Sequence, residues 1–456
     1  MLFLLEMSNI LNYQNKNNYI YTNQTDALRI MLDNNVFLTG PAGSGKTFLL
    51  KAFIQHSLKN NRKVAVTAMT GSAAYLINGR TLHSWAGIRL GKEDKEELVD
   101  RIYGNFKSRV NWKYVETLII DEISMLTLTL LEKLDYIARK IRNNDQPFGG
   151  IHLILSGDFC QLPPIEDLDE IKEKEKDYCF KSILWNKLID YNLCLNTIFR
   201  QEDQTFQKML NKIRIGKVDD QINKILYQCS LKKINKDAAI QPTKLFPYKK
   251  DVEKINKKHL IKLNNNIITH SIKTEVIELT NGWNKNDINY QSKYMDSNHP
   301  YVEKLEICIG AQVMLNVNLK QELGLINGSR GVIIGIQEDT YYPEVEFMSG
   351  LRMVVEPYTW EHEVENKGMI KKTQIPLVLS WCMSIHKSQG LSLDCVKIDI
   401  GKKIFEYGQA YVALSRVRSL CFEPEEGKNE GLYIVSYSPD KIKCHKDVLN
   451  FYNKFI

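Results

Sequence analysis

The chain has 456 residues, a formal net charge of +7, and 43% hydrophobic and 25% charged residues. This length exceeds what one hydrophobic core supports and predicts about three domains, while the composition excludes a disordered or fibrous chain. The modest positive charge is compatible with a polyanionic partner but does not by itself indicate one.

The cysteines and the N-terminus exclude several further classes. The nine cysteines are scattered without a C-x-x-C pair, and no H-E-x-x-H motif is present. This pattern argues against a structural zinc site and favours isolated thiols in a reducing compartment. The apolar start Met1–Leu5 is interrupted by Glu6, is too short for a signal peptide or membrane span, and is not followed by an Arg-rich presequence. The sequence therefore predicts a soluble intracellular protein of the nucleus, the cytoplasm or a viral replication site, with no membrane partner.

Short apolar runs in the first half of the chain have the length and β-branching of buried parallel strands. Helical patterns lie between most of them, and Leu130–Ile141 is the clearest. Strands that alternate with helices predict an α/β domain with a parallel sheet covered on both faces. The predicted strands are Val36–Leu38, Val64–Thr67, Leu118–Ile120, His152–Leu155 and Leu193–Leu195.

Residues Gly40–Thr47 satisfy every fixed position of the phosphate-binding motif G-x-x-x-x-G-K-[ST]. The motif follows the predicted strand Val36–Leu38 and precedes Phe48–Ile54, which can begin a helix. Glycines let backbone N–H groups close around a pyrophosphate, and the helix N-terminus adds positive potential. We expect Lys46 to reach the β and γ phosphates and the Thr47 hydroxyl to hold Mg²⁺, whereas the alternative is a chance glycine turn. The predicted ATP cradle comprises Gly40, Pro41, Ala42, Gly43, Ser44 and Gly45.

Two polar segments follow later predicted strands of this half. Asp121 and Glu122 come directly after a buried apolar run, and strand ends in such sheets line the ligand crevice. We expect Asp121 to hold Mg²⁺ through water and Glu122 to orient and deprotonate the attacking water. In Gly157–Pro164, Gln161 is the candidate sensor of the γ-phosphate, and the alternative is an ordinary strand exit fixed by two prolines.

Two further segments of the first half do not fit a strand or helix of the α/β core. Leu90–Trp112 is a polar insert between two predicted strands. Asp167–Asp177 is an acidic and basic run that we expect to be a solvated loop or helix surface. Both are therefore predicted to lie outside the first parallel sheet.

The second half of the chain shows an interrupted α/β pattern. It begins around Lys244–Pro247, continues through the predicted helix Asp251–Leu263, and resumes near Val396–Ile400 and Ala410–Leu414. Between these pieces, Leu305–Pro376 contains short strands broken by Asn-Gly and Ser-Gly turns. This change predicts a small β-barrel inserted into the second lobe. Its predicted strands are Val313–Leu315, Gly331–Ile336, Val345–Phe347 and Met353–Val355.

A series of segments resembles, in order, the motifs of Pif1-type DNA helicases of superfamily 1. The segments span nearly the whole chain, and their joint occurrence is far more specific than any one of them. Leu131–Gly150 also resembles the stretch that marks Pif1 helicases among their relatives. The matching segments are Asn23-Gln24, Gly40–Thr47, Val64–Ile88, Leu118–Leu126, Gly149–Pro164, Phe199–Gln201, Trp381–Leu393 and Gln409–Arg418.

The resemblance implies an α/β fold of two RecA-like P-loop NTPase lobes with parallel sheets, plus a small inserted SH3-like β-barrel. ATP would lie between the lobes and single-stranded DNA across their tops. Residues 1–200 would form lobe 1A, with Leu90–Trp112 as a small 1B wedge at the duplex junction. Residues 201–304 and 377–456 would form lobe 2A, and residues 305–376 the inserted 2B barrel.

The resemblance also assigns roles at the nucleotide site. Gln24 would read the adenine edge, and Gln389 and Gly390 would couple the nucleotide to the DNA strand. Arg200 and Arg416 would act as arginine fingers from opposite sides of the cleft. Two guanidiniums can stabilise charge on the γ-phosphate oxygens. If a moving lobe supplied them, hydrolysis would depend on closure of the cleft. An ordinary surface position is the alternative for either arginine alone.

The expected DNA track combines polar and aromatic side chains in two blocks of the sequence. Hydroxyls and amines can hold phosphates, and rings can stack on bases without reading sequence. A core aromatic is the alternative for Trp85, and a helix cap is the alternative for His386. The candidate DNA-binding residues are Thr70, His83, Ser84, Trp85, His386, Lys387 and Ser388.

The implied function is an ATP- and Mg²⁺-dependent DNA helicase that moves 5′ to 3′ on single-stranded DNA. It would unwind forked or tailed duplex in replication, recombination, repair or telomere maintenance, with a single-strand-binding or replication protein as a possible partner. The alternatives are an RNA helicase, a RecD-like subunit of a recombination complex, and a nucleotide-gated DNA clamp that does not unwind. The intact pair Asp121-Glu122 and the two candidate arginine fingers argue against the clamp.

Overall fold

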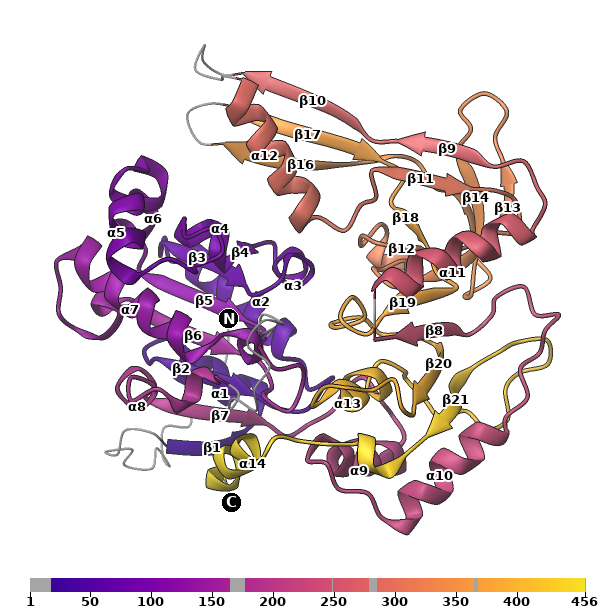
Figure 1. Ribbon diagram of the computed structural model, residues 1–456, viewed down its shortest axis with the longest axis horizontal. Coiled ribbons are helices and arrows are strands. Elements are labelled where there is room, and N and C mark those ends of the chain that lie inside the picture. Colours follow the sequence, from indigo (N-terminus) through magenta and orange to yellow (C-terminus); the bar gives the residue numbers. More distant parts are fainter. Residues whose placement is uncertain (1–17, 165–176, 248, 279–284, 365–367, 456) are drawn as a thin grey trace, which may run out of the picture.

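The computed structural model describes residues 18–164, 177–247, 249–278, 285–364 and 368–455. Figure 1 shows an N-terminal lobe, a second lobe formed by segments before and after a group of antiparallel strands, and those strands beside them. The apolar start of the chain and nearly all of the acidic and basic run Asp167–Asp177 lie outside the described residues. No described helix is long and apolar enough to cross a membrane.

The first lobe is built on a seven-stranded parallel sheet with the order β1-β7-β2-β6-β5-β3-β4. All strands that we predicted in this half are confirmed, most of them slightly longer than predicted. The two edge strands, β1 and β4, were not predicted, because neither presents a buried apolar run. The strands are β1 (Asn18–Thr22), β2 (Val36–Thr39), β3 (Val64–Ala68), β4 (Arg80–Thr81), β5 (Thr117–Asp121), β6 (His152–Ser156) and β7 (Tyr191–Leu195).

Helices cover both faces of this sheet (Figure 1). The predicted helix Leu130–Ile141 is confirmed within α7, which begins where the Thr127 hydroxyl accepts a hydrogen bond from the Leu130 N–H at 3.0 Å. The α-helices are α1 (Gln24–Met31), α2 (Lys46–Lys59), α3 (Gly71–Leu76), α4 (Leu82–Ala86), α5 (Lys95–Tyr103), α6 (Phe106–Tyr114), α7 (Leu128–Arg142) and α8 (Trp185–Leu188). Short 3₁₀ turns are η1 (Ile123–Met125), η2 (Pro147–Gly150) and η4 (Cys179–Lys181).

Alternate residues of the central strands pack on opposite faces of the sheet, as the two-residue period of a strand requires. On one face, Phe37 and Leu118 join the core formed with α4 to α7. On the other face, Leu38 and Ile119 join the core formed with α1 and α2. Every residue of β2 and β5 is buried, which explains why these strands read as continuous apolar runs in the sequence.

The predicted insert Leu90–Trp112 forms most of α5 and α6 and packs on α7. Although its composition is polar, Leu98, Ile102 and Trp112 are fully buried in the first lobe's core. These apolar residues lie on the faces of α5 and α6 that pack on the first lobe. Its role as a wedge at a duplex junction stays a prediction.

The second lobe contains a four-stranded parallel sheet with the order β19-β8-β20-β21. The α/β pattern expected around Lys244–Pro247, Val396–Ile400 and Ala410–Leu414 is confirmed, and the helix predicted at Asp251–Leu263 is found as α11. The strands are β8 (Thr243–Phe246), β19 (Cys382–Ser384), β20 (Cys395–Ile400) and β21 (Gly431–Tyr437). The helices of this lobe are α9 (Gln204–Arg214), α10 (Asp220–Leu231), α11 (Lys249–Lys262) and α13 (Gln409–Leu414), with the 3₁₀ turn η6 (Pro439–Lys441). The chain ends in α14 (Lys446–Tyr452) and the 3₁₀ turn η7 (Asn453–Phe455).

Antiparallel strands interrupt this lobe between α11 and β19. They form a five-stranded sheet, β15-β14-β13-β12-β18, a three-stranded sheet, β10-β17-β16, and a two-stranded sheet, β11-β9. The strands are β9 (Ile268–Ser271), β10 (Lys273–Glu278), β11 (Lys304–Ile307), β12 (Gln312–Leu315), β13 (Arg330–Ile336), β14 (Pro343–Phe347), β15 (Arg352–Val354), β16 (Tyr358–Val364), β17 (Gly368–Gln374) and β18 (Leu377–Leu379). Helix α12 (Lys285–Asn298) and the 3₁₀ turn η5 (Gln321–Leu323) lie among them.

The antiparallel region is larger than the insert that we predicted from Leu305 to Pro376. Its strands begin at Ile268, because β9 and β10 pair with β11 and β17 far along the chain. The strands predicted for the insert are confirmed and belong to the five-stranded sheet. A closed SH3-like barrel and the domain boundaries remain predictions.

The C-terminal segment returns from the second lobe to the first. Figure 1 places α14 and the C-terminus next to β1, on the N-terminal lobe. Val448, Phe451 and Phe455 are buried in the first lobe's core. The ring of Phe451 lies 5.9 Å from that of Phe37 in β2, centroid to centroid. The end of the chain is therefore a second covalent connection between the lobes.

Candidate nucleotide and DNA site

The phosphate loop Gly40–Thr47 joins β2 to α2 at the carboxyl edge of the first sheet. Gly43 and Gly45 have φ angles of +85° and +84°, which glycine adopts without strain. A Cβ atom on Gly43 would lie 2.6 Å from the Cβ of Arg200, and one on Gly45 would lie 2.2 Å from Nε2 of Gln24. Both glycines are therefore favoured by their backbone conformation, and Gly43 is also required by the close approach of Arg200.

The loop fits a polyphosphate group. The Lys46 ammonium donates to the carbonyl oxygens of Gly40 at 2.8 Å and Pro41 at 3.2 Å, so it lies folded across the loop. Burial lowers the pKa of Lys46, and the carboxylates of Asp158 and Glu122 act in the opposite direction. The Ser44 hydroxyl is buried and has no partner within the described part of the chain. Phosphate oxygens carry negative charge and accept hydrogen bonds. The Lys46 ammonium, the Ser44 hydroxyl and a glycine-rich loop can supply the positive charge and the donors.

Asp121 and Glu122 stand at the carboxyl end of β5, as predicted. Burial raises the pKa of Asp121, and burial together with the neighbouring Asp121 carboxylate raises the pKa of Glu122 to about 7. The backbone of Glu122 is left-handed, with φ 56° and ψ 46°, a conformation that is uncommon for non-glycine residues. A buried carboxylate whose charge interacts with Lys46 of the phosphate loop fits a divalent cation, and a carboxylate with a pKa near neutrality fits a general base.

Gln389 connects the two lobes at this carboxylate. Its side-chain amide donates to Oε2 of Glu122 at 2.8 Å and to Oε1 of Gln161 at 3.5 Å. Gln161 and Gln389 are 5% and 8% exposed, so water competes little for these bonds. The structure thus brings together three residues that the sequence placed in separate motifs, and the second lobe directly contacts the predicted base.

Arg200 extends from the first lobe to the backbone of the second. Its guanidinium donates to the carbonyl oxygens of Ser415 at 3.1 Å and Gly390 at 3.5 Å. Burial and the nearby charge of Arg416 lower the pKa of Arg200 to about 9. The contacts of Arg200 with the second lobe therefore argue against the alternative of an ordinary surface arginine. They also differ from an ion pair, because both acceptors are backbone carbonyl oxygens.

Arg416 is buried, with 2% of its surface exposed. It donates to the Val412 carbonyl at 2.8 Å and to the Ser415 hydroxyl at 2.7 Å, both neutral acceptors. Burial lowers its pKa to about 10. Within the residues that the structure describes, no carboxylate forms an ion pair with Arg200 or Arg416. Two neighbouring cations, the buried Arg416 and the half-buried Arg200, have no carboxylate partner among these residues, and this arrangement favours binding of an anion.

Two residues of this site were not singled out from the sequence. Phe199 is 61% exposed and lies 3.6 Å from the position of a Cβ on Gly45, beside Gln24. An exposed ring at this position can stack on a purine base. The Tyr411 hydroxyl accepts a hydrogen bond from the Ala42 N–H at 2.8 Å and so joins α13 to the phosphate loop. Both residues occur within matched motifs, but no local pattern identifies their contacts.

The predicted DNA-binding residues of the first lobe lie around α3 and α4. Thr70 caps α3, with its hydroxyl accepting from the Ala73 N–H at 3.3 Å. Burial lowers the pKa of His83, which keeps the ring neutral near pH 7. Trp85 is 5% exposed and packs on Trp112 at a centroid distance of 4.7 Å. This burial favours the core alternative for Trp85, and DNA contacts by the first-lobe residues, Ser84 among them, remain a prediction.

The predicted DNA-binding residues of the second lobe follow β19. Ser388 is fully buried, and its hydroxyl donates to the Ile385 carbonyl at 2.7 Å. Burial lowers the pKa of His386. The Lys387 N–H donates to the Ser384 hydroxyl at 3.2 Å, so the segment forms a tight turn. Ser388 thus shapes this turn, while contacts of His386 and Lys387 with DNA remain predictions.

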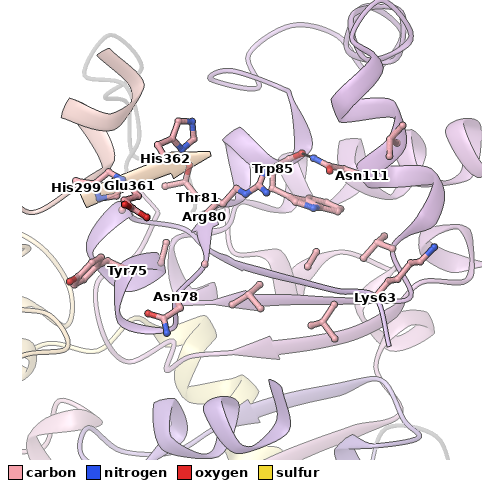
Figure 2. A pocket seen from close by; sticks show the side chains of 18 of the residues that line it. Lys63, Tyr75, Asn78, Arg80, Thr81, Trp85, Asn111, His299, Glu361 and His362 are labelled. Atoms are coloured by element: carbon pink, nitrogen blue, oxygen red, sulfur yellow. Dashed lines mark hydrogen bonds between the residues drawn. The ribbon is translucent and has the colours of Figure 1, made fainter. Parts of the chain in front are cut away.

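A pocket of about 560 Å³ lies between the first lobe and the three-stranded sheet, away from the phosphate loop. Figure 2 shows Arg80 and Trp85 from the first lobe opposite His362 from the antiparallel region. Burial lowers the pKa of His299 and of His362 to about 4. The pocket marks where the antiparallel region meets the lobe that carries Thr70 and His83.

Comparison with protein families gives two matches within the chain. The PIF1-like helicase family matches residues 12–224. The family described as DNA helicase Pif1, 2B domain, matches residues 295–336. The second match lies within the antiparallel region and spans β11, β12 and β13.

Similarity to individual proteins extends over nearly the whole chain. The rat ATP-dependent DNA helicase PIF1 is 38% identical over 431 residues, which cover 94% of this chain and 63% of that protein. The chain therefore spans 63% of the length of this curated relative. The crystal structure of Pif1 helicase from Candida albicans is 34% identical, with a TM-score of 0.73 and coverage of 99% of this chain and 100% of that one.

Pif1 from Bacteroides sp. in complex with ADP-AlF4 is 29% identical, with a TM-score of 0.75 and coverage of 95% and 96% of the two chains. The same Bacteroides helicase bound to single-stranded DNA has a TM-score of 0.59, with coverage of 94% and 95%. The two α/β lobes are thus RecA-like lobes of a Pif1 helicase fold. The chain belongs to the PIF1-like helicase family.

Proposed function

We propose that this chain is an ATP- and Mg²⁺-dependent DNA helicase that moves 5′ to 3′ on single-stranded DNA and unwinds forked or tailed duplex. The observation that carries this proposal is the interface between the lobes. There, the buried Arg416 and the half-buried Arg200 form a cationic pair close to Glu122, and no carboxylate of the described residues forms an ion pair with either. The Bacteroides relative, crystallised with ADP-AlF4 and with single-stranded DNA, supports the same two ligands for this chain.

The phosphate loop binds and orients the nucleotide. Backbone N–H groups of the loop and the Lys46 ammonium hold the β and γ phosphates. Thr47 and Asp121 would hold Mg²⁺, which neutralises phosphate charge when it is bound. Phe199 and Gln24 lie on the base side of the loop, where the ring stacks on the adenine and the amide reads its edge.

Glu122 then acts as the general base. With a pKa of about 7, its carboxylate accepts the proton from the attacking water as that water bonds to the γ-phosphorus. The bond between the γ-phosphorus and the bridging oxygen breaks, and ADP leaves with the bond electrons. Arg200 and Arg416 stabilise the negative charge on the transferred oxygens.

The contact of Gln389 with Glu122 and Gln161 provides the coupling between hydrolysis and movement. Because Gln389 belongs to the second lobe, rotation of that lobe changes the hydrogen bonding of the base. The same turn carries His386 and Lys387, which we propose to contact the DNA backbone. Binding of DNA and hydrolysis of ATP are therefore linked through one short segment.

The Glu122→Gln variant tests the assignment. It removes the base while keeping the size of the side chain, so we expect unchanged binding of ATP and DNA and loss of both ATP hydrolysis and strand separation. The matched control is Glu338→Gln at an exposed position of the antiparallel region. Unwinding by Glu122→Gln at the rate of the control would refute the assigned base. Stimulation of the wild-type ATPase by RNA but not by DNA would instead favour an RNA helicase.

A further inference from the structure

A buried polar cluster lies directly behind the phosphate loop, outside the residues assigned above. At its centre is the Asp158 carboxylate, which is fully buried. Arg214 donates to it twice, from Nε to Oδ2 at 2.9 Å and from Nη2 to Oδ1 at 2.8 Å. The guanidinium of Arg214 also lies 4.5 Å from the ring centroid of Tyr452. This bidentate geometry fixes the carboxylate in position and orientation.

The Tyr452 hydroxyl completes the cluster. It lies 3.2 Å from Oδ1 of Asp158 and 2.7 Å from the Thr39 hydroxyl, and it accepts from the Phe159 N–H at 3.1 Å. A phenol has one hydrogen to donate, and a carboxylate can only accept. Tyr452 therefore donates to Asp158 and accepts from Thr39 and from Phe159. This single hydroxyl satisfies three groups, all from the first lobe.

The cluster joins four separate parts of the chain. Thr39 is the last residue of β2, immediately before the phosphate loop, and Asp158 begins the turn that carries Gln161. The Asp158 carbonyl accepts from the Gln161 N–H at 2.9 Å, so Asp158 directly shapes this turn. Arg214 ends α9, whose apolar residues belong to the core of the second lobe. Tyr452 ends α14, the segment that returns to the first lobe.

The charges of the cluster also extend to the nucleotide site. Burial alone would raise the pKa of Asp158, but Arg214, Lys46 and the Cys160 N–H together outweigh burial and lower the pKa, so the carboxylate is ionised. Its charge acts on the Lys46 ammonium. A fixed carboxylate behind the loop thus helps to keep Lys46 protonated despite its burial.

We propose that Asp158, Arg214 and Tyr452 are positioning residues for ATP hydrolysis, which hold Gln161 in register with the phosphate loop. The inference rests on the proposed ATPase activity. The cluster fixes both ends of the catalytic arrangement, the loop entry at Thr39 and the turn at Gln161, to one phenol from the C-terminal helix. It acts through Gln161 and does not touch the nucleotide.

Tyr452→Phe is the perturbation, because it removes only the hydroxyl. Hydrolysis is measured with saturating single-stranded DNA, and kcat is expressed per nucleotide-binding site counted by titration with a fluorescent ADP analogue. We expect kcat per site to fall about 10-fold, or about 1.4 kcal/mol in the barrier, with KM for ATP and ADP affinity within about 2-fold of wild type. The matched control is Tyr437→Phe, which removes a hydroxyl bond to Asn223 of 2.5 Å within the second lobe and leaves kcat unchanged.

A double-mutant cycle with Gln161→Ala identifies the path of the effect. If Tyr452 acts through Gln161, Tyr452→Phe causes little further loss of kcat in the Gln161→Ala background. A full 10-fold loss in that background would overturn the inference, as would an unchanged kcat in the single variant. Fewer binding sites with normal kcat per site would also overturn it, since that result indicates only a folding role. Absence of hydrolysis by the wild type would refute the proposed function itself.

Discussion

Replacing Arg416 by alanine should separate catalysis from folding. The guanidinium is buried, yet its acceptors are neutral groups, the Val412 carbonyl at 2.8 Å and the Ser415 hydroxyl at 2.7 Å. Loss of these hydrogen bonds is partly offset, because the alanine variant no longer buries a cation. The variant also leaves no buried carboxylate without its partner. We therefore expect the free energy of unfolding to fall by only about 1–3 kcal/mol.

The catalytic effect should be far larger. An arginine finger contributes about 10³- to 10⁵-fold to kcat, which corresponds to about 4–7 kcal/mol of transition-state stabilisation. Arg200 remains in place and keeps part of the cationic field, so we expect a loss near the lower end of this range, about 10³-fold. Affinity for ADP should be unchanged, because ADP lacks the γ-phosphate that the guanidinium addresses.

The assay is DNA-stimulated ATP hydrolysis, with thermal unfolding measured on the same preparation. The control is Arg418→Ala, two residues along the chain, where the side chain is 53% exposed and lies 3.7 Å from Asp394. Exposed ion pairs contribute little, so this control should keep its activity and its melting temperature. A kcat for Arg416→Ala within 10-fold of the control would refute the assignment of Arg416 as a finger.

Two other perturbations follow from the geometry. Gly43→Ala should weaken ATP binding at least about tenfold, because the new Cβ would lie 2.6 Å from the Cβ of Arg200, an atom too near the backbone to move away. The matched control is Gly350→Ala, which has a similar φ of +82° but no atom within 4 Å of the added Cβ. ATP affinity is measured by nucleotide titration, and equal affinity of the two variants would contradict this reasoning. Burial lowers the pKa of His299 and of His362 to about 4, so both rings stay neutral in the folded chain above about pH 4. In the unfolded chain the same rings take up protons below about pH 6.5. Stability is therefore lost as the pH falls from about 6.5 to about 4, on the order of 1–2 kcal/mol per ring at pH 5. Melting temperatures at pH 7 and pH 5 should differ less for the double variant with glutamine at both positions than for the wild type, and an equal difference would argue against these two histidines.

The parallel sheets could be predicted from the sequence because burial on both faces leaves a local signature. β2 and β5 consist entirely of buried residues, and their apolar runs follow directly from that position. The antiparallel strands β9 and β10 carry no such signature. They alternate or are polar, and they are stabilised by pairing with strands that are not their neighbours in the sequence, β9 with β11 and β10 with β17. Only the folded chain therefore reveals them.

The candidate site also contains one part that the sequence shows locally and one part that only the fold shows. The phosphate loop is local, and its glycines and lysine can be recognised in eight consecutive residues. The cluster of Asp158, Arg214 and Tyr452 instead joins residues separated by 56 and 294 positions, and no spacing rule connects them. Trp85 illustrates the converse, since its motif suggested base stacking while its contact with Trp112 depends on how α4 and α6 pack.

The most direct test of the central claim is displacement of a labelled strand by the wild-type chain from two duplexes, one with a 5′ single-stranded tail and one with a 3′ tail. The account predicts ATP- and Mg²⁺-dependent displacement from the 5′-tailed duplex only. Displacement from the 3′-tailed duplex alone would contradict the proposed direction. ATP hydrolysis stimulated by DNA without displacement from either duplex would contradict a helicase and support a nucleotide-gated clamp.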